Sequence, residues 1–206
     1  MNVLDQMFAS PVAATIMVIT LITSIKAEQD PSLKAKFIFH PVSVWQRREG
    51  YRLFTSALIH GGWFHLAFNM LAFYFFAFTL ETPGQYLNHW QFALLYVVSM
   101  GFSSLPALIR HRDNPGYQAL GASGAVSAVV LSMVIFEPHI GIGLLFIPGY
   151  IPGWLFALLY MGFSFVAGLK QWGNIGHEAH LFGAIAGILI TLILEPQAAS
   201  NFLQQF

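Results

Sequence analysis

The chain has 206 residues, of which 56% are hydrophobic and only 9% are charged. A soluble globular domain has roughly 25% charged residues, so this composition excludes an ordinary water-soluble domain. Nine basic and nine acidic side chains cancel, which leaves no positive excess for a nucleic-acid partner. Cysteine is absent, so any catalysis or ligand binding has to use other side chains.

Six apolar segments, each long enough for a membrane crossing of about 20 residues, follow one another along the chain. Uninterrupted apolar runs favour helices over barrel strands, in which apolar and polar residues alternate. The fold class predicted is therefore an all-α polytopic membrane protein built as a six-helix bundle. The predicted spans are 7–25, 53–80, 89–109, 120–136, 144–169 and 177–194.

The connectors between these spans hold nearly all of the charge. The first, residues 26–52, mixes charged with aromatic residues, which is typical of the membrane interface. No Lys or Arg precedes Lys26, so the first apolar run is predicted to be a retained span rather than a cleaved signal. All nine Lys and Arg lie in connectors one, three and five or at their edges. Taken alone, the positive-inside rule places these connectors in the cytoplasm.

Polar side chains inside the spans need a structural or a functional explanation. His65 and Asn69 are four residues apart and share one helical face, which makes them a candidate site pair. His60 is five residues from His65, about 140° around a helix, and is not required to face the same way. Each of these residues taken singly is more often an interhelical hydrogen-bonding group than a catalyst.

The fourth span begins with Gly121, Ala122, Ser123 and Gly124, which put a hydroxyl among small residues at a helix start. Backbone amides at a helix start have no intrahelical partner, so they can donate to an oxyanion if Ser123 attacks a peptide carbonyl. A lone serine in a span is usually structural, because it hydrogen-bonds to its own helix. The glycines beside Ser123 favour the nucleophile interpretation.

His180 is the best candidate base for Ser123, because Gly183 and Gly187 follow it on the same helical face. A stripe of small residues lets two helices pack closely, so the sixth span can bring the imidazole to the hydroxyl. Glu178 lies about 200° around the helix from His180 and is expected to point away. The sequence thus predicts a Ser/His dyad, with His177 interpreted as a satisfied histidine at the loop edge.

These motifs, in this order, resemble those of the rhomboid intramembrane serine proteases. Residues 49–55 look like the first-loop segment of that family, with Arg52 at its arginine and Tyr51 where a tryptophan is usual. The spacing of His60 and His65 is similar, and His65 with Asn69 matches its HxxxN pattern. Residues 121–124 match GxSG, and residues 179–187 match AHxxGxxxG.

The resemblance implies that Ser123 is the nucleophile and His180 the base and then the acid. It also implies that Asn69, His65 and the amide of Ser123 stabilise the oxyanion. The whole chain, residues 1–206, would be one rhomboid-like transmembrane domain. It would lie in the cell (inner) membrane and cleave transmembrane helices of other membrane proteins in the lipid bilayer, without metal or cofactor.

The chain departs from the family pattern at three positions and in its charge distribution. Tyr51 and Ser56 are substitutions, and Ser127 stands where some members have a tyrosine that packs on the catalytic histidine. Support for His180 would then be absent or come from elsewhere. Rhomboids usually open their active site away from the cytoplasm, on the side where this chain has its Lys and Arg. We keep the family topology as the prediction.

Two other classes of function remain as alternatives to an active protease. A catalytically inactive rhomboid-like protein that binds membrane clients would be expected to lack Ser123 or His180, and both are present. A transporter with His65, Asn69, Glu178 and His180 along an ion path would be expected to have broken-helix pairs or an inverted repeat, which we do not find. A zinc protease needs HExxH, whereas His177–His180 reads HEAH, one residue short.

Overall fold

The computed structural model describes residues 3–144, 147–170, 172 and 176–206, and within them nearly all regular structure is helical. The N-terminal part comprises α1 (Val3–Ala9), α2 (Pro11–Gln29), α3 (Pro31–Phe37), α4 (Pro41–Gln46), α5 (Arg52–Thr55) and a 3₁₀ turn, η1 (Ser56–Leu58). The rest comprises α6 (Trp63–Leu80), α7 (His89–Arg110), α8 (Ser123–Phe136), β1 (Gly141–Leu144), β2 (Ile147–Pro152), α9 (Gly153–Lys170), α10 (His177–Leu194) and α11 (Gln197–Leu203).

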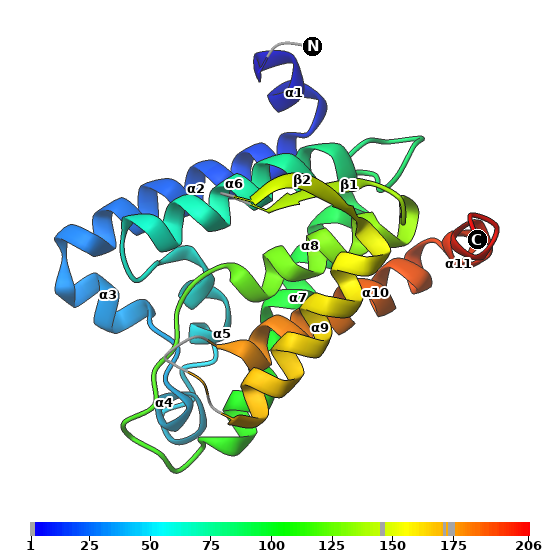
Figure 1. The fold of residues 1–206 in the computed structure, drawn as a ribbon. Coiled ribbons are helices and arrows are strands. Elements are labelled where there is room, and N and C mark those ends of the chain that lie inside the picture. The colour runs from blue at the N-terminus through cyan, green and yellow to red at the C-terminus, as the bar shows by residue number, and fades with distance from the viewer. Residues whose placement is uncertain (1–2, 145–146, 171, 173–175) are drawn as a thin grey trace.

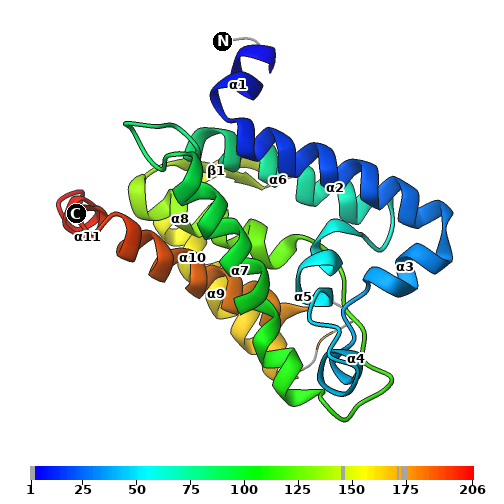
Figure 2. The ribbon, with the colours of Figure 1, turned by 180° about the vertical axis from the view of Figure 1, so that it is seen from behind.

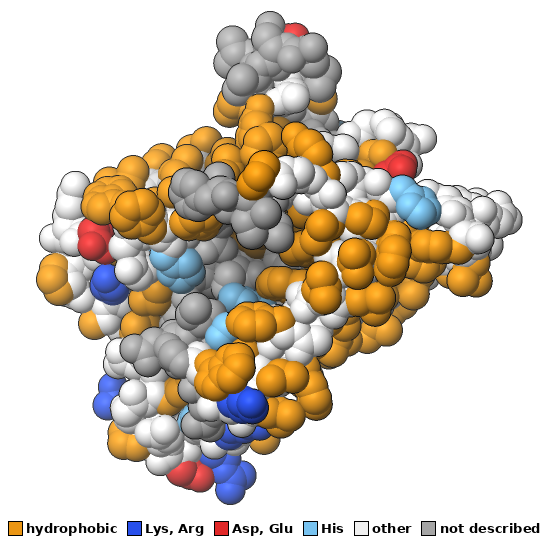
Figure 3. Space-filling view, in the orientation of Figure 1, with side chains coloured by type: hydrophobic (Ala, Val, Ile, Leu, Met, Phe, Trp, Pro, Cys, Tyr) orange, Lys and Arg blue, Asp and Glu red, His pale blue; other side chains and the backbone are white. Residues whose placement is uncertain are grey.

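Helices occupy the core of all six predicted spans, so the all-α polytopic prediction is confirmed. Among the described residues, five helices are long and apolar enough to cross a membrane: α2, α6, α7, α9 and α10. The views from the two sides show these helices around α8 (Figures 1 and 2). Hydrophobic side chains cover much of the visible face, and Lys and Arg gather at the end of the molecule where α4 lies (Figure 3).

Helix α8 is the centre of the bundle. Every residue from Gly124 to Val134 is buried, so this helix is hydrophobic all round. Its 14 residues span about 21 Å at 1.5 Å per residue, less than the hydrocarbon thickness of about 30 Å. The fourth predicted span is thus a short central helix, α8, whose first residue, Ser123, is partly buried.

Two predicted span boundaries were wrong. The second span was expected to start at residue 53, but the chain breaks after η1 and α6 begins only at Trp63. Gly62 precedes it with φ of +124°, a conformation that side chains with a Cβ rarely adopt. The fifth span was expected from residue 144, but β1 and β2 pair there as an antiparallel hairpin, with Gly141 opposite Pro152. Residues 145 and 146 lie outside the described part of the chain.

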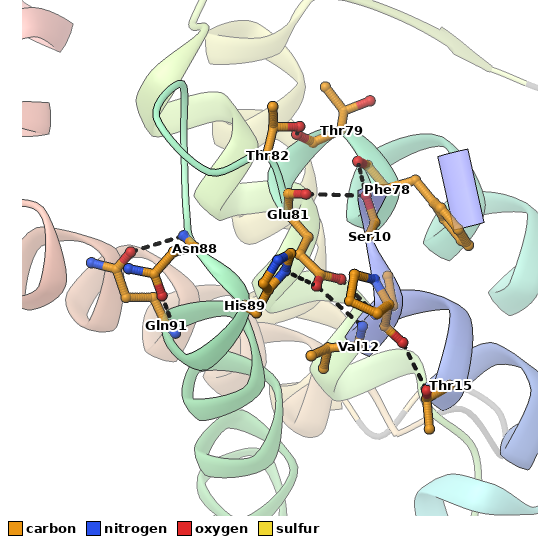
Figure 4. A network of polar contacts seen from close by, with 12 residues as sticks. Ser10, Val12, Thr15, Phe78, Thr79, Glu81, Thr82, Asn88, His89 and Gln91 are labelled. Carbon is orange, nitrogen blue, oxygen red and sulfur yellow. Dashed lines mark hydrogen bonds and ion pairs between the residues drawn. The ribbon is translucent and has the colours of Figure 1, made fainter. Parts of the chain in front are cut away.

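The ends of α2, α6 and α7 are joined by a polar network around Glu81 (Figure 4). The carboxylate of Glu81 is fully buried and accepts hydrogen bonds from the first-turn amides of Val12 (3.1 Å) and Ala13 (2.6 Å). His89 Nδ1 lies 2.6 Å from the same carboxylate. Ser10 Oγ in turn donates to the backbone oxygens of Phe78 and Glu81. Glu81 after α6 therefore accepts from the first-turn amides of α2, and Ser10 before α2 donates to carbonyl oxygens at the end of α6.

The predicted interfacial connector 26–52 is built from short helices that Arg52 holds together. Its guanidinium is buried and donates to Glu49 (2.5 Å) and to the carbonyl oxygens of Ala35 and Ile38 (both 2.8 Å). Phe39 forms an isolated antiparallel bridge with Ala119 in the segment that leads to α8. The connector thus braces the entry to the candidate site, at the same end as the starts of α8 and α10.

Candidate active site

Ser123 and His180 meet at the starts of α8 and α10. His180 Nε2 lies 2.7 Å from Ser123 Oγ, although 57 residues separate them in sequence. Both side chains are partly buried. Ser123 is the first residue of α8. The backbone amides of the first helical turn have no intrahelical partners and point toward the N-terminal end of the helix, where Ser123 lies. The arrangement places a hydroxyl, a proton acceptor and backbone donors at one point.

Close packing of α10 on α8 produces this contact. A Cβ at Gly183 would overlap the backbone of Gly124, and a Cβ at Gly187 would overlap that of Ala128. Deeper in the bundle, Ser132 Oγ donates to the Gly187 carbonyl at 3.2 Å, and Thr191 Oγ1 donates to Ser132 Oγ at 2.8 Å. The small-residue stripe of the sixth span is therefore a packing seam, and this seam sets the distance between imidazole and hydroxyl.

His65 lies against Gly121 in the loop before α8. An ideal Cβ on Gly121 would lie 2.8 Å from His65 Nε2, and Gly121 has φ of +115°, so only glycine fits there. The Gly61 amide donates to His65 Nδ1 at 3.3 Å. Because Nδ1 accepts, the neutral ring has its hydrogen on Nε2, the nitrogen beside Gly121. His65 can thus donate into the space next to Ser123.

Asn69 is buried one turn further along α6. Its Nδ2 donates to the His65 carbonyl oxygen at 2.9 Å, which fixes the amide group in position. An amide NH₂ has two hydrogens, so one donor of Asn69 is still available for another acceptor. The structure therefore brings all four predicted site residues to one end of the bundle: Ser123, His180, His65 and Asn69.

His60 was not predicted to face His65, because that prediction assumed one continuous helix. The chain break before Trp63 changes the geometry, and the two rings lie 5.0 Å apart, edge to face. Ser24 Oγ donates to the Leu58 carbonyl at 2.8 Å, so His60 Nδ1–H must be the donor to Ser24 at 2.9 Å. His60 Nε2 then accepts from the Ala122 amide at 3.3 Å.

Burial, with a smaller contribution from the neighbouring His65, lowers the pKa of His60 to about 3. The ring therefore stays neutral near pH 7, the form in which Nε2 can accept a hydrogen bond. His60 holds the backbone next to Ser123 rather than touching the dyad. A sequence signal for this role existed in the Gly61–Gly62 pair, which marks a break between the two histidines.

Tyr160 on α9 is a site residue that the sequence analysis missed. Its ring stacks on that of His180, with centroids 6.2 Å apart and an interplanar angle of 18°. Its hydroxyl lies 2.5 Å from Ser127 Oγ, one turn after Ser123. Packing support for His180, in question because Ser127 replaces a tyrosine, thus comes from another helix. No local pattern marks Tyr160, because aromatic residues are common in every span.

Glu178 and His177 do not complete a triad. Glu178 forms an ion pair with Arg110 at the end of α7, away from His180, as its helical position predicted. His177 is buried with its ring 6.0 Å from that of His180, but its Nδ1 has no hydrogen-bond partner among the described residues. The prediction that His177 is a satisfied loop-edge histidine was therefore wrong. Among all the residues that the structure describes, no three His, Asp or Glu side chains lie close enough to hold a metal ion.

Comparisons with known proteins all point to the same family. A profile of the rhomboid domain matches residues 47–197, which include the four predicted site residues. A putative rhomboid protease, YdcA, of Bacillus subtilis (strain 168) is 32% identical over 148 residues, covering 70% of this chain and 67% of that protein. The mitochondrial Rhomboid protein 1 of Saccharomyces cerevisiae is 33% identical over 142 residues, covering 65% and 39%.

A third relative, RHOMBOID-like protein 4 of Arabidopsis thaliana, is 28% identical over 173 residues, covering 71% of this chain and 43% of its own length. The matched region thus spans less than half of the yeast and plant relatives. The profile match covers well over half of this chain, which fixes the family. With its apolar helices, the chain belongs to the rhomboid family of intramembrane proteases and is a multi-pass integral membrane protein.

Proposed function

We propose that this protein is an active intramembrane serine endopeptidase that hydrolyses peptide bonds in or near transmembrane helices of other membrane proteins. The observation that supports the proposal is the 2.7 Å separation between Ser123 Oγ and His180 Nε2. This distance lies within the range of about 2.6 to 3.2 Å that a general base needs to take a proton from its nucleophile.

The dyad would act in two steps. His180 Nε2 takes the hydroxyl proton while Ser123 Oγ attacks the peptide carbonyl, which gives a tetrahedral oxyanion. The imidazolium then returns the proton to the departing amine and leaves an acyl-enzyme. A water molecule, activated by the same imidazole, hydrolyses the ester and regenerates Ser123. No metal ion or cofactor takes part.

We expect three hydrogen-bond donors to stabilise the oxyanion. They are the amide of Ser123 at the start of α8, the second N–H of Asn69 and the Nε2–H of His65. Donors fixed before the reaction need little reorganisation as charge develops, which makes them more effective than free water. His60 supports them indirectly, since it holds the Ala122 amide and with it the loop before Ser123.

The proposed substrates are membrane proteins with at least one transmembrane helix. Inside a helix the peptide carbonyl is hydrogen-bonded and covered by side chains, so the segment has to unwind before Ser123 can attack. Residues that weaken helices near the cleaved bond are therefore expected to speed cleavage. The chain's own membrane, and the side to which the site opens, remain predictions.

Cleavage of a single-span substrate by the purified protein in detergent tests the proposal. Wild type should cleave it, and Ser123→Ala and His180→Ala should each abolish cleavage while the proteins stay folded by circular dichroism. Activity that persists without Ser123, or that a chelator removes, would reject the dyad. A folded wild type that binds but never cleaves such substrates would support the client-binding alternative.

A further inference from the structure

The environment of Tyr160 bears on how the dyad is held, and the inference drawn from it rests on the proposed function. Ser127 Oγ lies 2.7 Å from the Ser123 carbonyl oxygen, to which it donates. A hydroxyl has one hydrogen, so in the 2.5 Å contact between Ser127 Oγ and Tyr160 the phenol must be the donor. A directed chain of hydrogen bonds thus runs from Tyr160 through Ser127 to the backbone of Ser123.

The ring of the same tyrosine contacts the other member of the dyad. It stacks nearly parallel on His180, and Phe156, one turn earlier on α9, stacks on Tyr160 with centroids 5.4 Å apart and an interplanar angle of 14°. Tyr160 is therefore fixed at both ends, by Phe156 on the ring and by Ser127 at the hydroxyl. One side chain of α9 spans the starts of α8 and α10.

The imidazole needs such an orienting contact because no carboxylate provides one. In a serine triad an aspartate holds the base in the right orientation. Here Glu178 is engaged by Arg110, and within the described part of the chain no acidic side chain bonds to His180. Rotation of the ring about its χ2 angle would move Nε2 away from Ser123. A parallel aromatic ring against its face limits that rotation.

We propose that Tyr160 is the positioning residue of this dyad, with its stacked ring holding His180 and its hydroxyl, through Ser127, holding the first turn of α8. In family members with a tyrosine at the position of Ser127, the aromatic ring comes from the helix of the serine. Here the ring comes from α9, and α8 contributes only the hydroxyl of Ser127. Tyr160 does not touch the reacting atoms. Its effect should therefore appear in the rate of the chemical step and not in substrate binding.

The test compares four variants with wild type: Tyr160→Leu, Tyr160→Phe, the exchange variant Ser127→Tyr with Tyr160→Ser, and the control Phe165→Leu. Phe165 lies on the same helix with its side chain largely exposed. Four quantities are measured in detergent: the rate of labelling by a fluorophosphonate, kcat and KM on a single-span substrate, and the unfolding midpoint. Labelling reports the reactivity of Ser123 without any substrate helix.

Tyr160→Leu is expected to lower both the labelling rate and kcat by about 10- to 100-fold, the range that a misplaced catalytic group produces, with KM within about twofold of wild type. Tyr160→Phe keeps the stacked ring and should fall between Tyr160→Leu and wild type. The exchange variant returns a ring to His180 from α8 and should recover most of the lost rate. The Phe165→Leu control should label at the wild-type rate.

Labelling and kcat of Tyr160→Leu at wild-type values would overturn the positioning role while leaving the proposed function intact. A change in KM alone would overturn it as well. If Tyr160→Leu does not fold, Tyr160→Phe and the exchange variant decide, because a folded exchange variant no faster than Ser123→Ala contradicts the proposal. A wild type that neither labels nor cleaves would instead reject the proposed function.

Discussion

Gly183 on α10 and Gly124 on α8 lie in direct backbone contact, so close that a Cβ on Gly183 would overlap the Gly124 carbonyl. Gly124 follows Ser123, and Gly183 lies one turn after His180. The glycine contact therefore sets how far the hydroxyl is from the imidazole. Any side chain at this point must separate the two helices, and with them the two proposed catalytic groups.

Substitution of Gly183 should lower stability and activity at once. The added methyl of Gly183→Ala has no space against the α8 backbone, and such overpacking costs about 1 to 3 kcal/mol. We expect a lower unfolding midpoint in detergent and a slower cleavage rate. The matched control is Gly162→Ala on α9, where a Cβ meets nothing within 4 Å. Equal stability of the two variants would contradict the packing argument.

Loss of the Asn69 amide should slow the chemical step. Asn69→Ala removes one donor proposed for the oxyanion, and loss of such a donor typically lowers kcat by about 10² to 10³. KM should change little, because the oxyanion exists only after attack. The measurement is steady-state cleavage of a single-span substrate, with the exposed Asn201→Ala of α11 as the control. An unchanged kcat would remove Asn69 from the proposed machinery.

Removal of the Glu81 carboxylate should destabilise the protein without changing the rate of the chemical step. Glu81→Ala leaves the amides of Val12 and Ala13 and the ring of His89 without their acceptor, for an expected loss of about 2 to 5 kcal/mol. Glu81 is 16 residues after His65, about 24 Å along the helix direction. The activity per folded molecule should therefore stay near wild type.

The control for Glu81 is Glu137→Ala, which removes an exposed carboxylate at the same end of the bundle. Thermal unfolding of both variants, followed by circular dichroism, measures the difference. A Glu81→Ala protein as stable as Glu137→Ala would show that the network in Figure 4 contributes little.

His60 should make stability depend on pH. Burial lowers its pKa in the folded protein to about 3 from an ordinary value of 6.5. Between these values the unfolded chain binds a proton that the folded protein does not, so acidification favours unfolding. The slope is about 1.4 kcal/mol per pH unit for a single such group. Above pH 6.5 both forms are neutral and the contribution vanishes.

Because carboxylates also titrate in this window, the measurement is the difference between wild type and His60→Gln. Glutamine can still accept from the Ala122 amide through its carbonyl oxygen but does not titrate. The unfolding midpoint of wild type should fall more steeply between pH 6.5 and 4 than that of His60→Gln. Parallel curves for the two proteins would contradict the buried, neutral state of His60.

Hydropathy and helical spacing were sufficient to predict much of the fold and the candidate residues. The predicted spans 89–109 and 177–194 match α7 and α10 within one residue, because each is a single apolar run between polar ends. The face shared by His65 and Asn69 and the stripe from His180 to Gly187 follow from the 3.6-residue period alone. Short-range patterns therefore located the four candidates.

The failures have a common physical cause, which is turn chemistry inside an apolar run. Gly61 and Gly62 end the helical path before α6, and Pro148, Gly149 and Pro152 lie in the hairpin before α9. A search for long apolar segments counts such turn residues as part of the span that follows. The same error hid the contact between His60 and His65, since the angle between them was taken from a helix that is not continuous there.

Tyr160 could not be predicted, because its role is defined by tertiary contacts. It is 33 residues from Ser127 and 20 residues from His180, and within its own helix it is one aromatic residue among several. The substitution at Ser127 indicated that support for the histidine had to come from another place. Only the packing of α9 against the starts of α8 and α10 identifies that place.

The central claim is that Ser123 is a nucleophile activated by His180, and labelling with a fluorophosphonate tests it most directly. The reagent bonds covalently to an activated serine and needs no knowledge of the natural substrate. Wild type should be labelled at one site, His180→Ala far more slowly, and Ser123→Ala not at all. Labelling of Ser123→Ala at the wild-type rate, or a folded wild type that stays unlabelled, would contradict the account.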